Sequence, residues 1–217
     1  MPKIKQRRFD EMRKLENVFE WTDYNSSNPF PKGTWNKKIF KNDNPIVLEL
    51  ACGKAEYSVG LGKLYPNKNF VGVDIKGNRM WVGATKAKSQ GMNNLRFLRA
   101  YIDHLDQFFC ENEVSEIWVL FSDPYIKKER KRLTSPKFLE LYRKIAKRGI
   151  SINLKTDSDL LYEFTHEVIE EENLEIYRDI KDVYEECPDD PQLSIQTYYE
   201  KMHLKNGKKI KFISFGL

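Results

Sequence analysis

The stretch "IVLELACGKAEYS" (residues 46–58) indicates the fold, because a short apolar run leads through small residues into a helix pattern. Residues 46–50 have the length and composition of a buried strand, and residues 55–65 have helical spacing. The same order returns in "NFVGVD" (69–74), which is followed by a helix pattern at 78–90. Strands that alternate with helices of about ten or more residues indicate βαβ units and a parallel sheet.

The alternation continues along the rest of the chain. Further strands are predicted at 94–100, 115–121 and 149–156, and further helices at 135–148 and 159–171. Two last strands, 175–180 and 208–215, can add to the sheet edge in antiparallel fashion, because the turn-like "KNGKK" precedes the second. Strands that are apolar on both faces require helices on both sides. The sequence therefore predicts an α/β fold, with a mostly parallel seven-stranded sheet and helices on both faces.

The bulk composition fits a soluble folded protein. Of 217 residues, 40% are hydrophobic and 32% charged, and no apolar run approaches the roughly 18 residues that a membrane span needs. We expect a basic and aromatic N-terminal extension over residues 1–44 and one domain over 45–217. Three widely spaced cysteines and three isolated histidines indicate no disulfide framework and no metal site, so we expect a reducing, cytoplasmic setting.

The charge distribution points weakly to a polyanionic partner. The net charge is +5 and the sequence pI is about 8.9. Charges of one sign are grouped along the chain: basic residues in 3–8, 127–132, 143–148 and 201–211, and acidic residues in 167–175 and 185–190. If the basic groups converge in the fold, the molecule has one positive side that suits a nucleic acid.

Four carboxylates lie at or just after the ends of predicted strands: Glu49, Asp74, Asp123 and Asp157. Each one alone fits a turn former or a helix cap. In open α/β sheets, however, ligands bind beyond the carboxyl ends of the strands. Four acids in the same topological position predict one acidic rim at the ligand site.

The first two of these acids suggest a nucleoside ligand. An acid after the second strand, here Asp74, can bind both hydroxyls of a ribose, and a small-residue turn around Gly53 lets a ligand approach the backbone. The dinucleotide fingerprint G-x-G-x-x-G and the GKS or GKT phosphate loop are absent. S-adenosylmethionine, which has a ribose and an adenine but no pyrophosphate, fits better than a dinucleotide. A plain strand-to-helix turn is the alternative.

The stretch "FSDPYIKKERKRLTSP" (121–136) places the dipeptide Asp123-Pro124 directly before five basic residues in the six positions 127–132. The residues alone leave two interpretations open for the dipeptide and two for the basic run. The dipeptide is either a turn after a strand or part of a ligand site. The basic run is either a solvated loop or a loop that binds phosphates.

The same stretch resembles the D-P-x-x-K motif and basic run of the bacterial tRNA (guanine-N7)-methyltransferases. Segments similar to the other family motifs follow in the family order: "LELACGKAE", "FVGVDI", "LKTDSDLLYEF" and, with the T-x-x-E of Thr197 to Glu200, "TYYEKMHLKNGKKI". The resemblance covers residues 45–215. It implies a Rossmann-like class I methyltransferase fold.

The resemblance also implies an activity and a set of site residues. The activity is transfer of a methyl group from S-adenosyl-L-methionine to N7 of a guanosine in tRNA, at position 46 of the variable loop. Asp123 is the implied catalytic residue. The implied cofactor-binding residues are Glu49, Gly53, Asp74, Tyr101 and Asp123. The implied substrate-binding residues are Lys127, Asp157, Thr197 and Glu200, and the implied RNA-binding residues are Lys128, Arg130, Lys131 and Arg132.

Three departures from the family pattern concern the cofactor side. The family turn is commonly G-x-G-x-G, whereas Ala51, Gly53 and Ala55 hold those positions here, and alanine restricts the backbone where φ must be positive. Ser122 replaces the first proline of the usual P-D-P. Many relatives carry an acid at the position of Tyr101, so adenine recognition there is expected to use a backbone amide or stacking, with Asp103 as a candidate substitute.

Two other functions stay open at this point. The chain could be an S-adenosylmethionine-dependent methyltransferase that acts on another RNA base or a small molecule. It could also be a catalytically silent RNA-binding relative with an altered turn. The N-terminal segment is either an arm that orders on tRNA or a part packed on the domain. We expect tRNA as the partner, neither membrane nor metal, and a monomer or homodimer.

Overall fold

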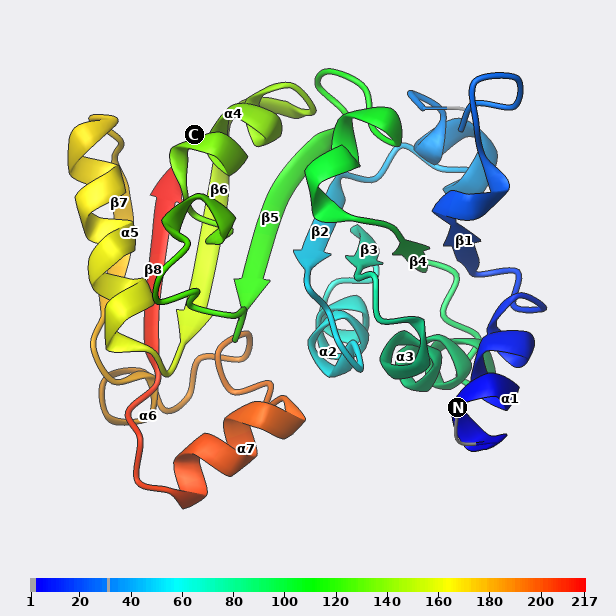
Figure 1. Ribbon diagram of the computed structural model, residues 1–217. Coiled ribbons are helices and arrows are strands. Elements are labelled where there is room, and N and C mark those ends of the chain that lie inside the picture. Colours follow the sequence, from blue (N-terminus) through cyan, green and yellow to red (C-terminus); the bar gives the residue numbers. More distant parts are fainter. Residues whose placement is uncertain (1–2, 31) are drawn as a thin grey trace.

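The predicted alternation of strands and helices is present in the computed structural model, which describes residues 3–30 and 32–217 (Figure 1). The strands are β1 (Val18–Glu20), β2 (Ile46–Leu50), β3 (Asn69–Val73), β4 (Leu95–Arg99), β5 (Val114–Leu120), β6 (Ala146–Thr156), β7 (Ile176–Ile180) and β8 (Lys211–Gly216). The α-helices are α1 (Lys3–Met12), α2 (Glu56–Leu64), α3 (Gly77–Ser89), α4 (Pro136–Arg143), α5 (Asp159–Glu171), α6 (Val183–Glu186) and α7 (Tyr198–Lys205). Shorter helical turns are η1 (Trp21–Asp23), η2 (Trp35–Phe40), η3 (Ile102–Gln107) and η4 (Glu129–Lys131).

The strands of the described residues form one eight-stranded sheet in the order β1-β4-β3-β2-β5-β6-β8-β7. The pairs from β1 to β6 are parallel, and β8 is antiparallel to both β6 and β7. The chain runs outward from β2 through β3 to β4 and then returns to β5 on the other side of β2. The strand order therefore reverses between β2 and β5, which is where open α/β sheets bind ligands.

The predicted fold class is confirmed, with one strand more than the seven expected. The extra strand, β1, comes from the segment that we predicted as an extension, and its three residues are too few for a periodic pattern. Other residues of that segment also pack inside: Trp35 is fully buried and its Nε1 donates to the carbonyl of Phe108 at 2.8 Å. The packed alternative is therefore the one observed for the described part of the segment, whereas a domain boundary at residue 44 stays a prediction.

Two C-terminal details differ from the sequence-based expectation. The helix predicted over 135–148 ends at Arg143, because the chain turns at Ile145 and β6 starts at Ala146. Ile145 is buried and lies at helical spacing from Tyr142, so the apolar pattern continued across this turn. Helix α7 was not predicted. Its signal was present in the sequence as Thr197 followed three residues later by Glu200, a capping box.

The sheet separates two apolar cores. One contains the buried faces of α4 and α5 together with aromatic side chains from residues 30–40, and the other contains those of α2 and α3 together with Met12 from α1. The carboxyl ends of β2, β3, β5 and β6 lie at one rim, beside α7 (Figure 1). Within the described residues, no helix has the length and apolar character needed to cross a membrane.

Candidate functional site

Two adjoining cavities open at the carboxyl ends of the parallel strands. The smaller, of about 390 Å³, lies over β2, β3 and β4, and the larger, of about 870 Å³, lies over β5, β6 and the start of β8. Six residues line both: Lys76, Arg79, Phe121, Ser122, Asp123 and Tyr199. The cavities therefore meet at the end of β5, next to the reversal in strand order.

The turn after β2 has a left-handed backbone at every second residue. Ala51, Gly53 and Ala55 have φ values of 57°, 55° and 54°. These are the positions at which the family pattern has glycine, so the alanines keep the backbone conformation that glycine adopts easily. The backbone N–H of Gly53 donates to Oδ2 of Asp74 at 2.9 Å, which ties the turn to the end of β3.

Asp74 and Glu49 lie at the floor of the smaller cavity, and both are largely buried. Oδ1 of Asp74 also accepts from the backbone N–H of Lys76 at 2.8 Å. Carboxylate oxygens accept more than one hydrogen bond, so Asp74 retains acceptor capacity for hydroxyls of a ligand. Glu49 accepts from the backbone N–H of Ser58 at 2.7 Å and from its hydroxyl. Burial raises the pKa of Glu49 to about 8, against the opposing effect of the Ser58 hydrogen bonds.

Tyr101 lines the smaller cavity and is 49% exposed. Its ring contacts that of Trp21, with the centroids 5.8 Å apart. Trp21 follows β1, so the N-terminal segment reaches the wall of this cavity. An aromatic pair thus occupies the position where many relatives were expected to carry an acid.

Asp123 lies where the two cavities meet, and its carboxylate is exposed. Among the described residues no hydrogen bond or ion pair engages it, whereas Glu49, Asp74 and Asp157 all have partners. Its neighbour Ser122 has a buried hydroxyl that no described group satisfies. Asp123 is therefore the rim carboxylate that is available to a bound molecule.

The larger cavity contains Asp157 from the end of β6. Oδ2 of Asp157 accepts from Nζ of Lys208 at 2.5 Å and lies 3.2 Å from Nδ1 of His203. The His203 ring stacks on Phe121, with the planes 16° apart. Sequence reasoning missed His203 as a cavity residue. The capping box predicts the helix that carries it, and His203 lies four residues after Tyr199, on the same face of that helix.

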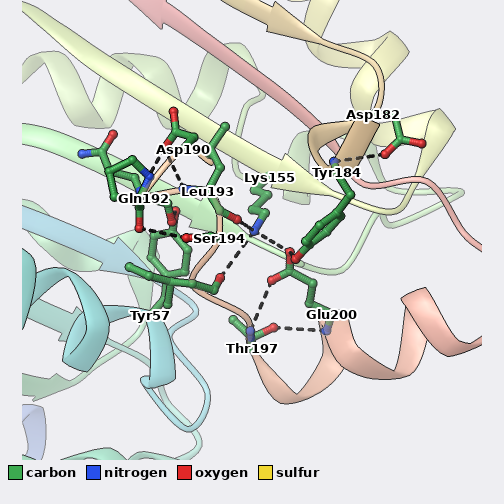
Figure 2. A network of polar contacts seen from close by, with 12 residues as sticks. Tyr57, Lys155, Asp182, Tyr184, Asp190, Gln192, Leu193, Ser194, Thr197 and Glu200 are labelled. Carbon is green, nitrogen blue, oxygen red and sulfur yellow. Dashed lines mark hydrogen bonds and ion pairs between the residues drawn. The ribbon is translucent and has the colours of Figure 1, made fainter. Parts of the chain in front are cut away.

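Helix α7 is fastened to the sheet by a buried network (Figure 2). Thr197 caps the helix, because its hydroxyl oxygen accepts from the backbone N–H of Glu200. In return, the Glu200 carboxylate accepts from the backbone N–H of Thr197. Glu200 forms an ion pair with Lys155 of β6, and both side chains are 0% exposed. Lys155 also donates to the carbonyl of Leu193 at 2.6 Å, and the Tyr184 hydroxyl donates to Oε1 of Glu200 at 2.7 Å.

The two residues of the capping box differ in their access to the cavities: Thr197 lines the smaller cavity, whereas Glu200 lines neither. Burial lowers the pKa of Lys155, and the charge and hydrogen bond of Glu200 oppose that shift. Burial, together with the hydrogen bond to Glu200, raises the pKa of Tyr184. Glu200 thus lies beneath the rim in a buried network. Its substrate contact stays a prediction.

The basic run after β5 divides into an exposed part and a buried residue. Lys127, Lys128, Arg130 and Lys131 are exposed, and Lys131 also lines the smaller cavity. Arg132 is 3% exposed, and its Nε donates to the carbonyl of Pro124 at 2.8 Å. Four of the five basic side chains can therefore meet a polyanion, while Arg132 faces inward.

The comparisons with known proteins agree with this geometry. A family model described as "Putative methyltransferase" matches residues 43–213. The chain is 49% identical over 220 aligned positions to a tRNA (guanine-N(7)-)-methyltransferase of Bacteroides fragilis, covering 100% of this chain and 87% of the relative. It is 52% identical over 190 positions to an enzyme of the same description from Porphyromonas gingivalis, covering 87% of this chain and 78% of the relative.

Solved structures share the fold at low sequence identity. The 16S rRNA methyltransferase KamB superposes with a TM-score of 0.66 at 14% identity, covering 89% of this chain and 94% of that one. A SAM-dependent methyltransferase from Aquifex aeolicus has a TM-score of 0.56 at 13% identity, covering 98% and 97%. The fold is thus a Rossmann-like methyltransferase fold, and the sequence relationship confirms the resemblance: the chain belongs to the tRNA (guanine-N7)-methyltransferase family.

Proposed function

We propose that the protein transfers a methyl group from S-adenosylmethionine to N7 of a guanosine in tRNA, with position 46 of the variable loop as the target. The observation that carries the proposal is the unengaged carboxylate of Asp123 between two adjoining cavities, in a chain that aligns over its full length with tRNA (guanine-N(7)-)-methyltransferases. One cavity suits a cofactor and the other a base. The target position rests on the family resemblance alone.

The smaller cavity suits S-adenosylmethionine, which supplies a methyl group on a cationic sulfonium when bound. Asp74 would accept from the ribose hydroxyls, and Glu49 adds a second acid to the same wall. Tyr101, whose ring contacts that of Trp21, would offer aromatic surface for the adenine in place of an acid. Ala51 keeps the left-handed backbone conformation that glycine has in the family turn. This favours an active cofactor site over the catalytically silent alternative.

Methyl transfer to guanine N7 requires alignment more than proton transfer. The N7 lone pair lies in the ring plane and needs no deprotonation, so positioning of the base dominates the barrier. Asp123 would accept hydrogen bonds from N1–H and the exocyclic amine of guanine. It would also offset the positive charge that develops on the methylated ring. Adenine would leave the carboxylate of Asp123 unpaired and is rejected for that reason.

The exposed cations Lys127, Lys128, Arg130 and Lys131 would bind tRNA phosphates around the target base. Such contacts set the position of the RNA and carry no direct sequence information. Asp157, which lines the larger cavity and is paired with His203 and Lys208, would contact the base.

The test uses unmodified tRNA and methyl-labelled cofactor, followed by aniline cleavage, which cuts the chain at 7-methylguanosine. With the wild-type protein we expect label in 7-methylguanosine and, in a parallel sample, one aniline cleavage site; Asp123→Ala should lower the rate of methyl transfer by at least about 100-fold, in line with the removal of a key transition-state contact. Glu170→Gln on the outer face of α5 serves as the control. A labelled nucleoside other than 7-methylguanosine would favour the alternative base, and wild-type turnover by Asp123→Ala would contradict the role of Asp123.

A further inference from the structure

Arg132 ends the basic run, yet its guanidinium is enclosed by protein. Nε donates to the carbonyl of Pro124 at 2.8 Å, and Nη2 lies 3.5 Å from the carbonyl of Tyr125. The guanidinium carbon lies 4.3 Å from the centre of the Phe164 ring on α5. One face of the group is thus covered by an aromatic ring, and its edge is bonded to the backbone that follows Asp123.

The backbone that Arg132 holds is in an unfavourable conformation. Phe121 and Tyr125, on either side of Asp123, have φ values of 47° and 41°, in the left-handed region that bulky side chains avoid. Such conformations persist only where the surrounding structure holds them in place, and they are concentrated at functional sites. Ser122 stands where the family pattern has a proline, so the chain lacks one local restraint on this loop.

We propose that Arg132 is a positioning residue for methyl transfer, which holds Asp123 at the junction of the two cavities, and that it does not bind tRNA phosphates. This inference rests on the proposed function. A phosphate contact would require the guanidinium to leave two carbonyls, the Glu129 carboxylate 3.5 Å from Nη1, and the Phe164 ring. The planar, forked guanidinium meets these partners together, which a lysine ammonium cannot do.

The neighbouring cations supply a matched comparison. Arg130→Gln and Arg132→Gln each remove one positive charge from the same loop. Arg130→Gln should lower the slope of log binding constant against log salt concentration by about 1 and raise KM for tRNA. Arg132→Gln should leave that slope unchanged and lower kcat at saturating tRNA by about 10- to 100-fold, the effect expected from a small misplacement of a reacting group.

Two more variants separate positioning from charge and from folding. Arg132→Lys keeps the charge and should still have a low kcat. Phe164→Leu changes no charge and should lower kcat in the same direction with the salt slope unchanged. Thermal melting and calorimetric binding of S-adenosylhomocysteine establish that each variant is folded. If Arg132→Gln does not fold, Arg132→Lys and Phe164→Leu provide the test.

The outcomes discriminate clearly. A salt slope reduced in Arg132→Gln as in Arg130→Gln, with the wild-type kcat retained, would overturn the inference and make Arg132 a phosphate ligand. A wild-type kcat together with a wild-type salt slope in Arg132→Lys would also overturn the inference. Absence of methyl transfer by the wild-type protein would overturn the proposed function and this inference with it, whereas a wild-type kcat in Arg132→Gln overturns this inference alone.

Discussion

Ala51 occupies a backbone conformation that costs a residue with a side chain about 1–2 kcal/mol. Its φ is 57°. Ala51→Gly should therefore raise the free energy of unfolding by about 0.5–1 kcal/mol, since the greater freedom of glycine in the unfolded chain offsets part of the gain. Ala87→Gly, inside α3, is the control and should lower the free energy of unfolding by about 1 kcal/mol or more. Urea denaturation measures both, and a loss of similar size in the two variants would contradict the account.

Glu49 is the residue whose protonation should make stability depend on pH near neutrality. Burial raises its pKa to about 8 from the ordinary 4.5. Between these values the folded state holds a proton that the unfolded chain has released. The stabilisation is therefore complete below about pH 4.5 and is lost as the pH rises through about 8. Glu49→Gln should flatten the fall in unfolding free energy between about pH 6 and 8.5, and parallel profiles for variant and wild type would rule out this titration.

At the scale of elements, helix α7 depends on the buried pair of Lys155 and Glu200. Glu200→Gln leaves the Lys155 ammonium buried without its counter-charge, which should cost about 3–5 kcal/mol of unfolding free energy. Burial already lowers the pKa of Lys155, so the deficit should shrink as the pH rises and Lys155 gives up its proton. Glu170→Gln, exposed on α5, is the matched control. Urea denaturation at several pH values measures the effect, and a cost below about 1 kcal/mol would contradict it.

The order of the elements could be predicted because their apolar periods are local. The strand at 46–50 and the helix at 159–171 were found with their observed bounds. The end of α4 was not, because Ile145 extends the helical pattern past the last helical residue. β1 could not be predicted either, because a strand of three residues has no period and forms only through its pairing with β4.

The sequence predicts which carboxylates lie at the rim of the candidate site, but not which charged side chains around it are buried. Parallel strands bring their carboxyl ends together, so Asp74, Asp123 and Asp157 could be grouped from their positions in the sequence. Whether a charged side chain faces out or in depends on contacts between distant segments. Arg132 meets Phe164, and Lys155 meets Glu200, and neither contact has a local signature.

At the scale of the whole molecule, the strand order sets the two cavities side by side at one edge of the sheet. Tyr101, Asp74 and Gly53 follow β4, β3 and β2 and line the smaller cavity. Asp157 follows β6 and lines the larger cavity, and Asp123, after β5, lines both. The N-terminal segment belongs to this architecture, because β1 extends the sheet beyond β4 and brings Trp21 against Tyr101, which lines the smaller cavity.

Methyl transfer to N7 of one guanosine requires that nitrogen, so replacing it with carbon gives the sharpest test. Two otherwise identical tRNAs would carry guanosine or 7-deazaguanosine at position 46, and transfer of labelled methyl from S-adenosylmethionine would be measured for each, with filter binding as the check that both bind. We expect transfer to the guanosine tRNA and none to the 7-deazaguanosine tRNA at equal binding. Equal transfer to both would contradict it.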